Sequence, residues 1–175
     1  IATYNINVKE NETFIYFSKH FTSLHLNVPQ VLYVSDDRKI YFQQNVGSKC
    51  LLDELEEQGH TNAVLDLYKK SLHHLARIQI LSHHNLDYNK CITAKEFGKE
   101  AIMSDLLYFK YYFLDTLKIP YDKEKLIGDF EALATYLAHV DHKYFMFRDF
   151  QSRNIMVKEN DVYFIDYQGG MKGAL

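Results

Sequence analysis

Residues 147–170 read FRDFQSRNIMVKENDVYFIDYQGG, and this stretch carries most of what the sequence predicts about the fold. Two runs of β-forming residues on either side of a short polar turn predict a tight hairpin, with strands near 155–158 and 162–166. Antiparallel pairing would bring Asn154, just before the first strand, close to Asp166 at the end of the second. Because neighbouring strands lie roughly 5 Å apart, the amide oxygen and the carboxylate could bind one hard cation.

Magnesium suits such a pair of oxygen ligands. The ion needs few protein ligands and completes its coordination shell with water and substrate phosphates. Asp149 lies five residues before Asn154, in the loop that leads into the hairpin. A carboxylate there could orient an acceptor hydroxyl and accept its proton during phosphoryl transfer. Each residue taken alone could be a turn former or a solvated charge. The combination of Asp149, Asn154 and Asp166 favours a catalytic site.

The composition excludes several other classes of function. The chain has 175 residues, of which 47% are hydrophobic and 15% aromatic, enough to form the core of one domain or of part of a larger one. The net charge of -3 leaves no excess of basic residues, so nucleic acid is not expected as a partner. No segment approaches the roughly 18 apolar residues of a membrane span. No membrane association is therefore expected. The two cysteines lack CxxC spacing, which favours a cytoplasmic protein.

Most of the remaining chain has a helical pattern. Apolar residues recur at helical spacing over residues 10–24, about 61–81, 93–113 and 122–140, and residues 31–46 predict a further hairpin. The third helix is expected to begin at Thr93, because Thr93 and Glu96 have capping-box spacing. Its Tyr and Phe residues are expected in the core, where helix-spaced aromatic residues usually pack. The order of elements disfavours a doubly wound sheet and a β-sandwich and agrees with an α+β class.

Two segments resemble a known family of enzymes. FRDFQSRN at 147–154 resembles the catalytic loop of the protein-kinase-like phosphotransferases, and IDYQGG at 165–170 resembles their metal-binding segment. The resemblance is closer to the aminoglycoside phosphotransferase family, whose relatives include choline kinases and amino-sugar kinases. It implies an α+β protein-kinase-like fold, with Asp149 as the catalytic base and Asn154 and Asp166 as the Mg²⁺ ligands. It also implies ATP as the phosphate donor and a small-molecule hydroxyl as the acceptor.

A weaker resemblance extends over the N-terminal part of the chain. The helix at 10–24 resembles the small-lobe helix of the family, whose Glu pairs with a phosphate-binding Lys. Glu10 is expected to be that residue, and Glu12 is the alternative. A solvated Glu at the start of a helix, favoured by the helix dipole, is the purely structural explanation of the same residue.

The resemblance also implies a division of the chain into two lobes. The second strand of the 31–46 hairpin resembles the strand that enters the interlobe hinge, near 44–47 in this sequence. Backbone groups near Gln44 and Val46 are therefore expected to meet the adenine of the nucleotide. Residues 1–46 would be the remainder of the small lobe, and residues 47–175 would be the helical large lobe, truncated at its C-terminus.

The sequence departs from the family pattern at several positions. Phe147 stands where the family usually has His, and Gln151 stands where protein kinases have a Lys that neutralises the transferred phosphate. Arg148 follows as in protein kinases, and Arg153 could supply the missing charge, although a structural salt bridge would explain it equally well. No GxGxxG motif occurs, and no strand-borne Lys precedes Glu10, so much of the phosphate cradle is lacking.

Two functions therefore follow from the sequence. The first is a fragment of a larger kinase, inactive alone, that in its complete form transfers the γ-phosphate of ATP to a hydroxyl of a sugar or amino sugar. The second is a catalytically degenerate kinase-like module that binds nucleotide or a protein partner without transferring phosphate. Phe147 and Gln151 favour the second slightly, whereas the complete set of Asp149, Asn154 and Asp166 favours catalysis.

Overall fold

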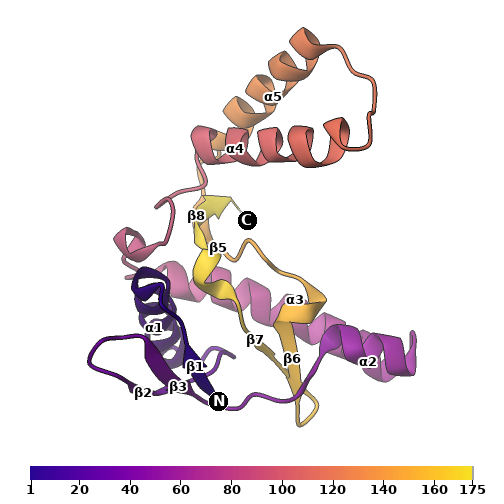
Figure 1. Cartoon of the computed structure of the whole chain (residues 1–175). Helices are drawn as coiled ribbons and strands as arrows, with labels where there is room; N and C mark the ends of the chain where they lie inside the picture. The colour runs from indigo at the N-terminus through magenta and orange to yellow at the C-terminus, as the bar shows by residue number, and fades with distance from the viewer. Residues whose placement is uncertain (175) are drawn as a thin grey trace.

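A computed structural model describes residues 1–174 and combines helices with short antiparallel strands (Figure 1). The N-terminal part consists of one helix and a three-stranded sheet in the order β1-β3-β2. Its elements are β1 (Ala2–Tyr4), α1 (Val8–Ser23), β2 (Val31–Val34) and β3 (Ile40–Gln43). The hairpin expected over 31–46 is confirmed as β2 and β3. The helix expected over 10–24 is confirmed as α1, which begins two residues earlier.

Local sequence signals explain where α1 begins and which face it buries. The side chain of Asn7 caps the helix by accepting a hydrogen bond from the Glu10 N–H at 3.3 Å. Phe14, Phe17 and Phe21 follow at helical spacing and are all buried. This aromatic stripe fixes α1 against the rest of the molecule.

The middle of the chain is helical, as its periodicity predicted. Its elements are α2 (Leu51–Gln58), α3 (Asn62–His83), η1 (Tyr88–Lys90), α4 (Lys99–Phe109), the π-helical turn η2 (Lys110–Asp115) and α5 (Lys123–Ala138). The helix expected from Asp122 is confirmed as α5, because the Asp122 side chain accepts from the Lys125 N–H at 3.1 Å. The acidic helix α2 was not predicted, since it has only eight residues and buries only Leu51.

The C-terminal part contains the hairpin that the sequence predicted. β6 (Ile155–Lys158) pairs with β7 (Asp161–Phe164), with Ile155 opposite Phe164. Two further pairings were not predicted, because they join segments that are distant in the sequence. β4 (Lys49–Cys50) extends this hairpin into a three-stranded sheet, and β5 (Lys143–Met146) pairs with β8 (Met171–Ala174).

The expected start of the third helix is wrong. α4 begins at Lys99 with Gly98 as its N-cap, not at Thr93. The preceding residues lie against the C-terminal strand, where the Phe97 N–H donates to the Lys172 carbonyl at 2.7 Å and the Lys172 N–H donates to the Lys95 carbonyl at 2.9 Å. These backbone hydrogen bonds replace the first helical turn that the capping-box spacing suggested.

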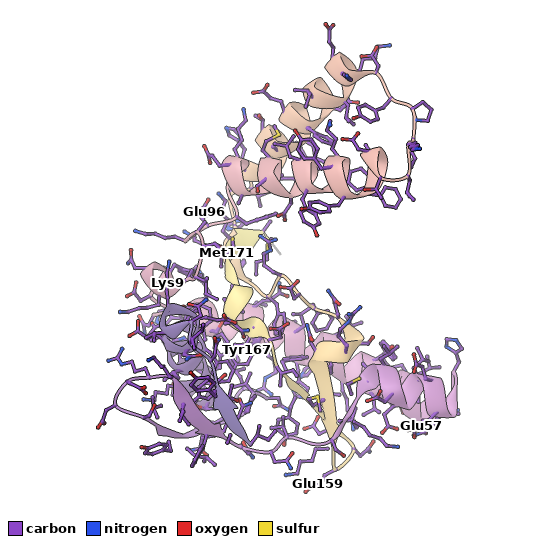
Figure 2. All side chains as sticks on the ribbon, in the orientation of Figure 1. Lys9, Glu57, Glu96, Glu159, Tyr167 and Met171 are labelled. Atoms are coloured by element: carbon purple, nitrogen blue, oxygen red, sulfur yellow. The ribbon has the colours of Figure 1, made fainter. Side chains whose placement is uncertain are left out.

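The aromatic residues of this region do not form the core that was expected of them. α4 and α5 pack on each other and stand away from the remaining elements (Figures 1 and 2). Tyr108 is 63% exposed and Tyr112 is 67% exposed, and the rings of Tyr111 and Phe113 are exposed as well. A pair of helices buries only one narrow stripe on each partner, so most of these rings remain at the surface.

The main core lies where α1 meets the C-terminal strands. The rings of Phe17, Phe21 and Phe145 contact one another, and Tyr167 packs beside them in the interior (Figure 2). Phe147, which replaces the His of the family pattern, is buried in the same cluster against Phe164. No helix within residues 1–174 has both the length and the apolar character needed to cross a bilayer.

Replacement of Phe17 by alanine is expected to lower the free energy of unfolding by about 3–5 kcal/mol, because the fully buried ring leaves a cavity between α1 and β5. Leu72→Ala serves as the control, since that side chain is 60% exposed and its loss should cost less than about 0.5 kcal/mol. Chemical denaturation followed by circular dichroism measures both values. Equal losses for the two variants would contradict the placement of Phe17 in the core.

Candidate active site

The β6–β7 hairpin brings Asn154 and Asp166 together at its open end. Asn154 closes the short helix η3 (Ser152–Asn154), and its carbonyl accepts a hydrogen bond from the Ile165 N–H at 3.0 Å. This bond continues the pairing by one step beyond the strands. As a result, Nδ2 of Asn154 lies 3.2 Å from Oδ2 of Asp166 and 3.0 Å from the backbone oxygen of Asp149.

Asp149 lies beside the segment that follows Asp166. A Cβ atom added to Gly169, in the short helix η4 (Tyr167–Gly169), would lie 3.2 Å from Oδ2 of Asp149. The missing side chain at Gly169 thus leaves room for the carboxylate. Asp149, Asn154 and Asp166 therefore share one small region of the surface, which the loop and the hairpin build together.

Two residues of this region have left-handed backbone conformations. Arg148 has φ of 71° and Asp166 has φ of 63°. Such a conformation costs a residue other than glycine on the order of 1 kcal/mol or more, and such strain concentrates at functional sites. The left-handed conformation turns the backbone at Asp166. The Asp166 carboxylate lies at the surface, whereas the ring of the next residue, Tyr167, is buried.

The two arginines expected at the site have different surroundings. The guanidinium of Arg148 donates to Oδ2 of Asp105 in α4 at 2.8 Å and lies over the ring of Phe97. Arg148 therefore ties the loop at residues 147–154 to the α4–α5 region through its own side chain. Arg153 is exposed on η3 and makes no ion pair with any residue in the range 1–174.

Negative charge gathers at the site. Partial burial raises the pKa of Asp166, and the carboxylates of Asp149 and Glu10 raise it further. Hydrogen bonds from Gln168 and Asn154 act in the opposite direction. Glu10 reaches this region from the first turn of α1, where its carboxylate accepts hydrogen bonds from two asparagine side chains.

Glu12, the alternative to Glu10, has a different partner. It forms an ion pair with Arg38 in the turn between β2 and β3. Of these two glutamates, only Glu10 affects the pKa of Asp166. No lysine forms an ion pair with Glu10 within the described part of the chain, residues 1–174.

The segment after β3 offers free backbone groups. The Gln44 N–H donates to the Gln30 carbonyl at 2.8 Å, which leaves the Gln44 carbonyl without a partner among residues 1–174. The N–H of Val46, a residue with a buried side chain, has no partner in the same range. The side-chain oxygen Oε1 of Gln43 is also buried and unpaired there. The Gln44 carbonyl and the Val46 N–H are therefore the groups of this segment that could hydrogen-bond with a ligand, whereas the Gln43 oxygen is enclosed by protein.

Gln168 and Gln43 were not among the residues predicted from the sequence. Nε2 of Gln168 donates to Oδ1 of Asp166 at 2.9 Å, and its Oε1 is a second buried oxygen without a partner in residues 1–174. The sequence could have indicated Gln168, because this residue follows the expected metal ligand Asp166 by only two positions. Gln43 gives no such signal, because its burial depends on the pairing of β3 with β1 and β2.

The residues present fit a magnesium ion better than a metal that needs several strong ligands. No group of three or more His, Cys, Asp or Glu side chains within residues 1–174 could hold a metal ion. The carboxylate of Asp166 and the amide oxygen of Asn154, which accepts no hydrogen bond in that range, are the oxygen ligands at hand. A cation there would also relieve the repulsion among Glu10, Asp149 and Asp166.

The raised pKa of Asp166 predicts that Asp166→Asn stabilises the fold at neutral pH. A raised carboxyl pKa costs stability above that pKa and costs nothing once the pH falls below the ordinary value of 3.8. Asparagine also tolerates the left-handed conformation. Urea denaturation at neutral pH should give a higher free energy of unfolding for the variant, and the gain should vanish in acid. A variant less stable at neutral pH would contradict this assignment.

Comparisons with known proteins identify the fold of this chain but no family. No protein-family model matches the chain, and no curated protein matches it. A solved structure that resembles it is a thermostable mutant of aminoglycoside phosphotransferase APH(4)-Ia, in ternary complex with ADP and hygromycin B. The identity is 14% and the TM-score is 0.55, and the match covers 99% of this chain and 59% of that chain. The chain therefore has the fold of an aminoglycoside phosphotransferase over nearly all of its length and spans about three-fifths of that protein.

Proposed function

We propose that this chain is part of a phosphotransferase that moves the γ-phosphate of ATP to a hydroxyl of a small molecule, a sugar or amino sugar. The observation that supports the proposal most is the convergence of Asp149, Asn154 and Asp166 at the end of one hairpin. The likeness in fold to a phosphotransferase structure that contains ADP gives independent support.

Each polar residue has a distinct role in this proposal. Asp149 orients the acceptor hydroxyl and accepts its proton as the phosphate is transferred. Asp166 and Asn154 hold Mg²⁺, which when bound neutralises charge on the phosphates. Arg153 is exposed and unpaired within residues 1–174, so its charge is available to the phosphates. Arg148 acts as a positioning residue, because its guanidinium holds the loop to Asp105.

The adenine would bind at the segment after β3, near residues 44–47. The Gln44 carbonyl and the Val46 N–H present an acceptor and a donor. This segment then divides residues 1–46, a small lobe, from residues 47–175, a large lobe. Glu10 would pair with a cation near the phosphates. No lysine of residues 1–174 takes that place, and the sequence contains no GxGxxG motif.

A degenerate module that binds nucleotide without transfer is the second candidate. The observation that favours it is the burial of Phe147 in the aromatic core, because a buried phenyl ring cannot make the hydrogen bonds of the usual His. Under this alternative, Mg²⁺ and ATP would still bind, but no acceptor would cause release of ADP.

Asp149→Asn is expected to lower acceptor-dependent ADP release by roughly 10²- to 10⁴-fold and to leave ATP binding unchanged. Asp129→Asn, an exposed position in α5, makes the same chemical change elsewhere and should keep full activity. ADP release is measured against amino sugars, neutral sugars, aminoglycosides and choline, with this chain and with the complete open reading frame. Release by neither protein, with ATP still bound, would favour the degenerate module.

Magnesium should increase the affinity for ATP through Asp166. Calorimetric titration of ATP with and without Mg²⁺ is expected to show this gain for the unmodified protein and for Asp129→Asn. Asp166→Asn should lose most of the gain, because the remaining amide oxygens are weaker ligands for a hard cation. An undiminished magnesium effect in Asp166→Asn would reject Asp166 as a ligand.

A further inference from the structure

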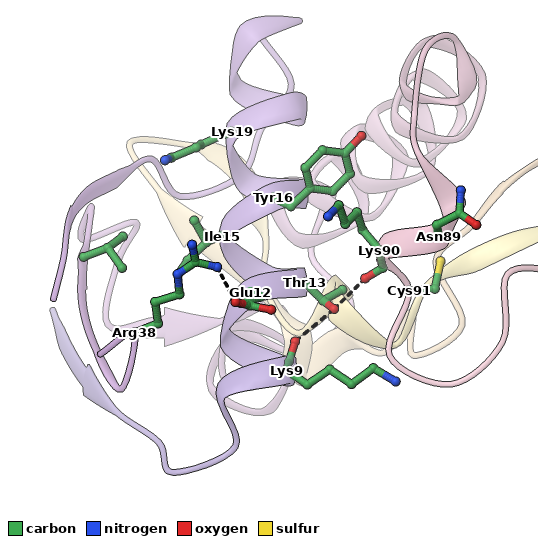
Figure 3. Close-up of a pocket in the computed structure, with 11 residues that line it drawn as sticks. Lys9, Glu12, Thr13, Ile15, Tyr16, Lys19, Arg38, Asn89, Lys90 and Cys91 are labelled. Carbon is green, nitrogen blue, oxygen red and sulfur yellow. Dashed lines mark hydrogen bonds and ion pairs between the residues drawn. The ribbon is translucent and has the colours of Figure 1, made fainter. Parts of the chain in front are cut away.

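A cavity of about 560 Å³ opens beside α1 and is lined by none of Glu10, Asp149, Asn154 and Asp166 (Figure 3). It lies between α1, the turn that joins β2 to β3, and the short helix η1. Lys9, Glu12, Tyr16 and Lys19 occur at helical spacing and line one side. Arg38 and Lys90 come from the two flanking elements. The volume lies within the roughly 300–1,000 Å³ that is typical of small-molecule sites.

The cavity carries a strong positive charge in a protein whose net charge is -3. Four cationic side chains line it, against the single carboxylate of Glu12. That carboxylate is paired with Arg38, as Figure 3 shows. Lys9, Lys19 and Lys90 make no ion pair with any residue among 1–174. The surplus of three unpaired ammonium groups favours a multivalent anion over a single carboxylate.

Buried hydrogen bonds fix the walls of the cavity. The hydroxyl of Thr13 donates to the Lys90 carbonyl at 2.6 Å, which joins η1 to α1 (Figure 3). The buried amide of Asn11 donates to the Arg38 carbonyl at 2.8 Å, which joins the β2–β3 turn to the same helix. Because both walls are tied to α1, the cationic side chains start from fixed backbone positions. Pre-organisation of this kind reduces the entropy that binding must overcome.

The cavity also offers a donor and an apolar surface. Oη of Tyr16 accepts a hydrogen bond from the Asp87 N–H at 2.8 Å, so its own proton is available to a ligand. Ile15 and Val34 contribute aliphatic surface. Burial raises the pKa of Cys91 to about 11, which keeps that thiol neutral. A ligand with an anionic head and an apolar body would match these features.

We propose that this cavity binds a small organic phosphate monoester, with Lys9, Lys19 and Lys90 turning toward the phosphate and the organic part against the apolar wall. The side chains of Lys9 and Lys19 point in opposite directions in the unliganded structure (Figure 3), so binding requires them to change rotamer. A dianionic phosphate accepts several charge-assisted hydrogen bonds at once, which a monoanion does not. This site is separate from the proposed site of phosphoryl transfer, and its occupation does not depend on that activity.

Calorimetric titration with phenyl phosphate tests the proposal, and inorganic phosphate and phenol serve as comparison ligands. Phenyl phosphate should bind with saturation and more tightly than either comparison ligand, and added NaCl should weaken its binding. The double variant Lys19→Gln, Lys90→Gln should lose about tenfold or more in affinity. The double variant Lys123→Gln, Lys125→Gln makes the same change of net charge in α5 and should bind as the unmodified protein does.

Backbone amide shifts in NMR spectra locate the ligand in the unmodified protein, whatever the stability of the variants. Shifts are expected in α1 and in residues 89–91, and not in residues 147–170. Shifts confined to the 147–170 region would overturn the proposal. Equal affinity of the two lysine double variants, or binding of phenol as tight as that of phenyl phosphate, would overturn it as well.

Discussion

The burial of Tyr167 is the constraint on which the rest of the structure depends. Its ring packs against Phe14, Phe21 and Phe147, and its hydroxyl hydrogen-bonds with Ser18 of α1. A buried hydroxyl without a partner would cost on the order of 1–3 kcal/mol. The position of α1 is therefore tied to the segment that immediately follows Asp166. Burial also raises the pKa of Tyr167, so the hydroxyl remains protonated and this hydrogen bond persists at neutral pH.

The same constraint explains the geometry of the candidate site. Tyr167 has its ring in the interior while Asp166 keeps a carboxylate at the surface, and the left-handed conformation of Asp166 makes this reversal possible. The burial of the ring offsets the local strain. Because Tyr167 holds α1 in place, it also holds Glu10 where its charge affects Asp166. One buried aromatic residue thus connects the N-terminal helix to the polar cluster without being part of it.

α1 separates two regions of opposite charge. Glu10 adds to the carboxylates of Asp149 and Asp166 on one side, and Lys9 and Lys19 add to the basic cavity on another. The modest net charge of the whole chain conceals this separation, because the two regions nearly cancel. Divalent cations and phosphate groups without a bound metal would consequently be attracted to different faces of one helix.

The sequence by itself determined the parts of the protein that depend on near neighbours in the chain. Helical spacing located α1, α3 and α5, and a short polar turn between β-forming runs located the β6–β7 hairpin and hence the approach of Asn154 to Asp166. The tertiary structure alone decided the pairing of β5 with β8, the start of α4 at Lys99, and the exposure of the aromatic residues of α4 and η2. It alone decided the unpaired oxygens of Gln43 and Gln168 and the basic cavity beside α1. These features arise from contacts between segments tens of residues apart, and hydrophobic periodicity shows which side of an element is apolar but not which partner covers it.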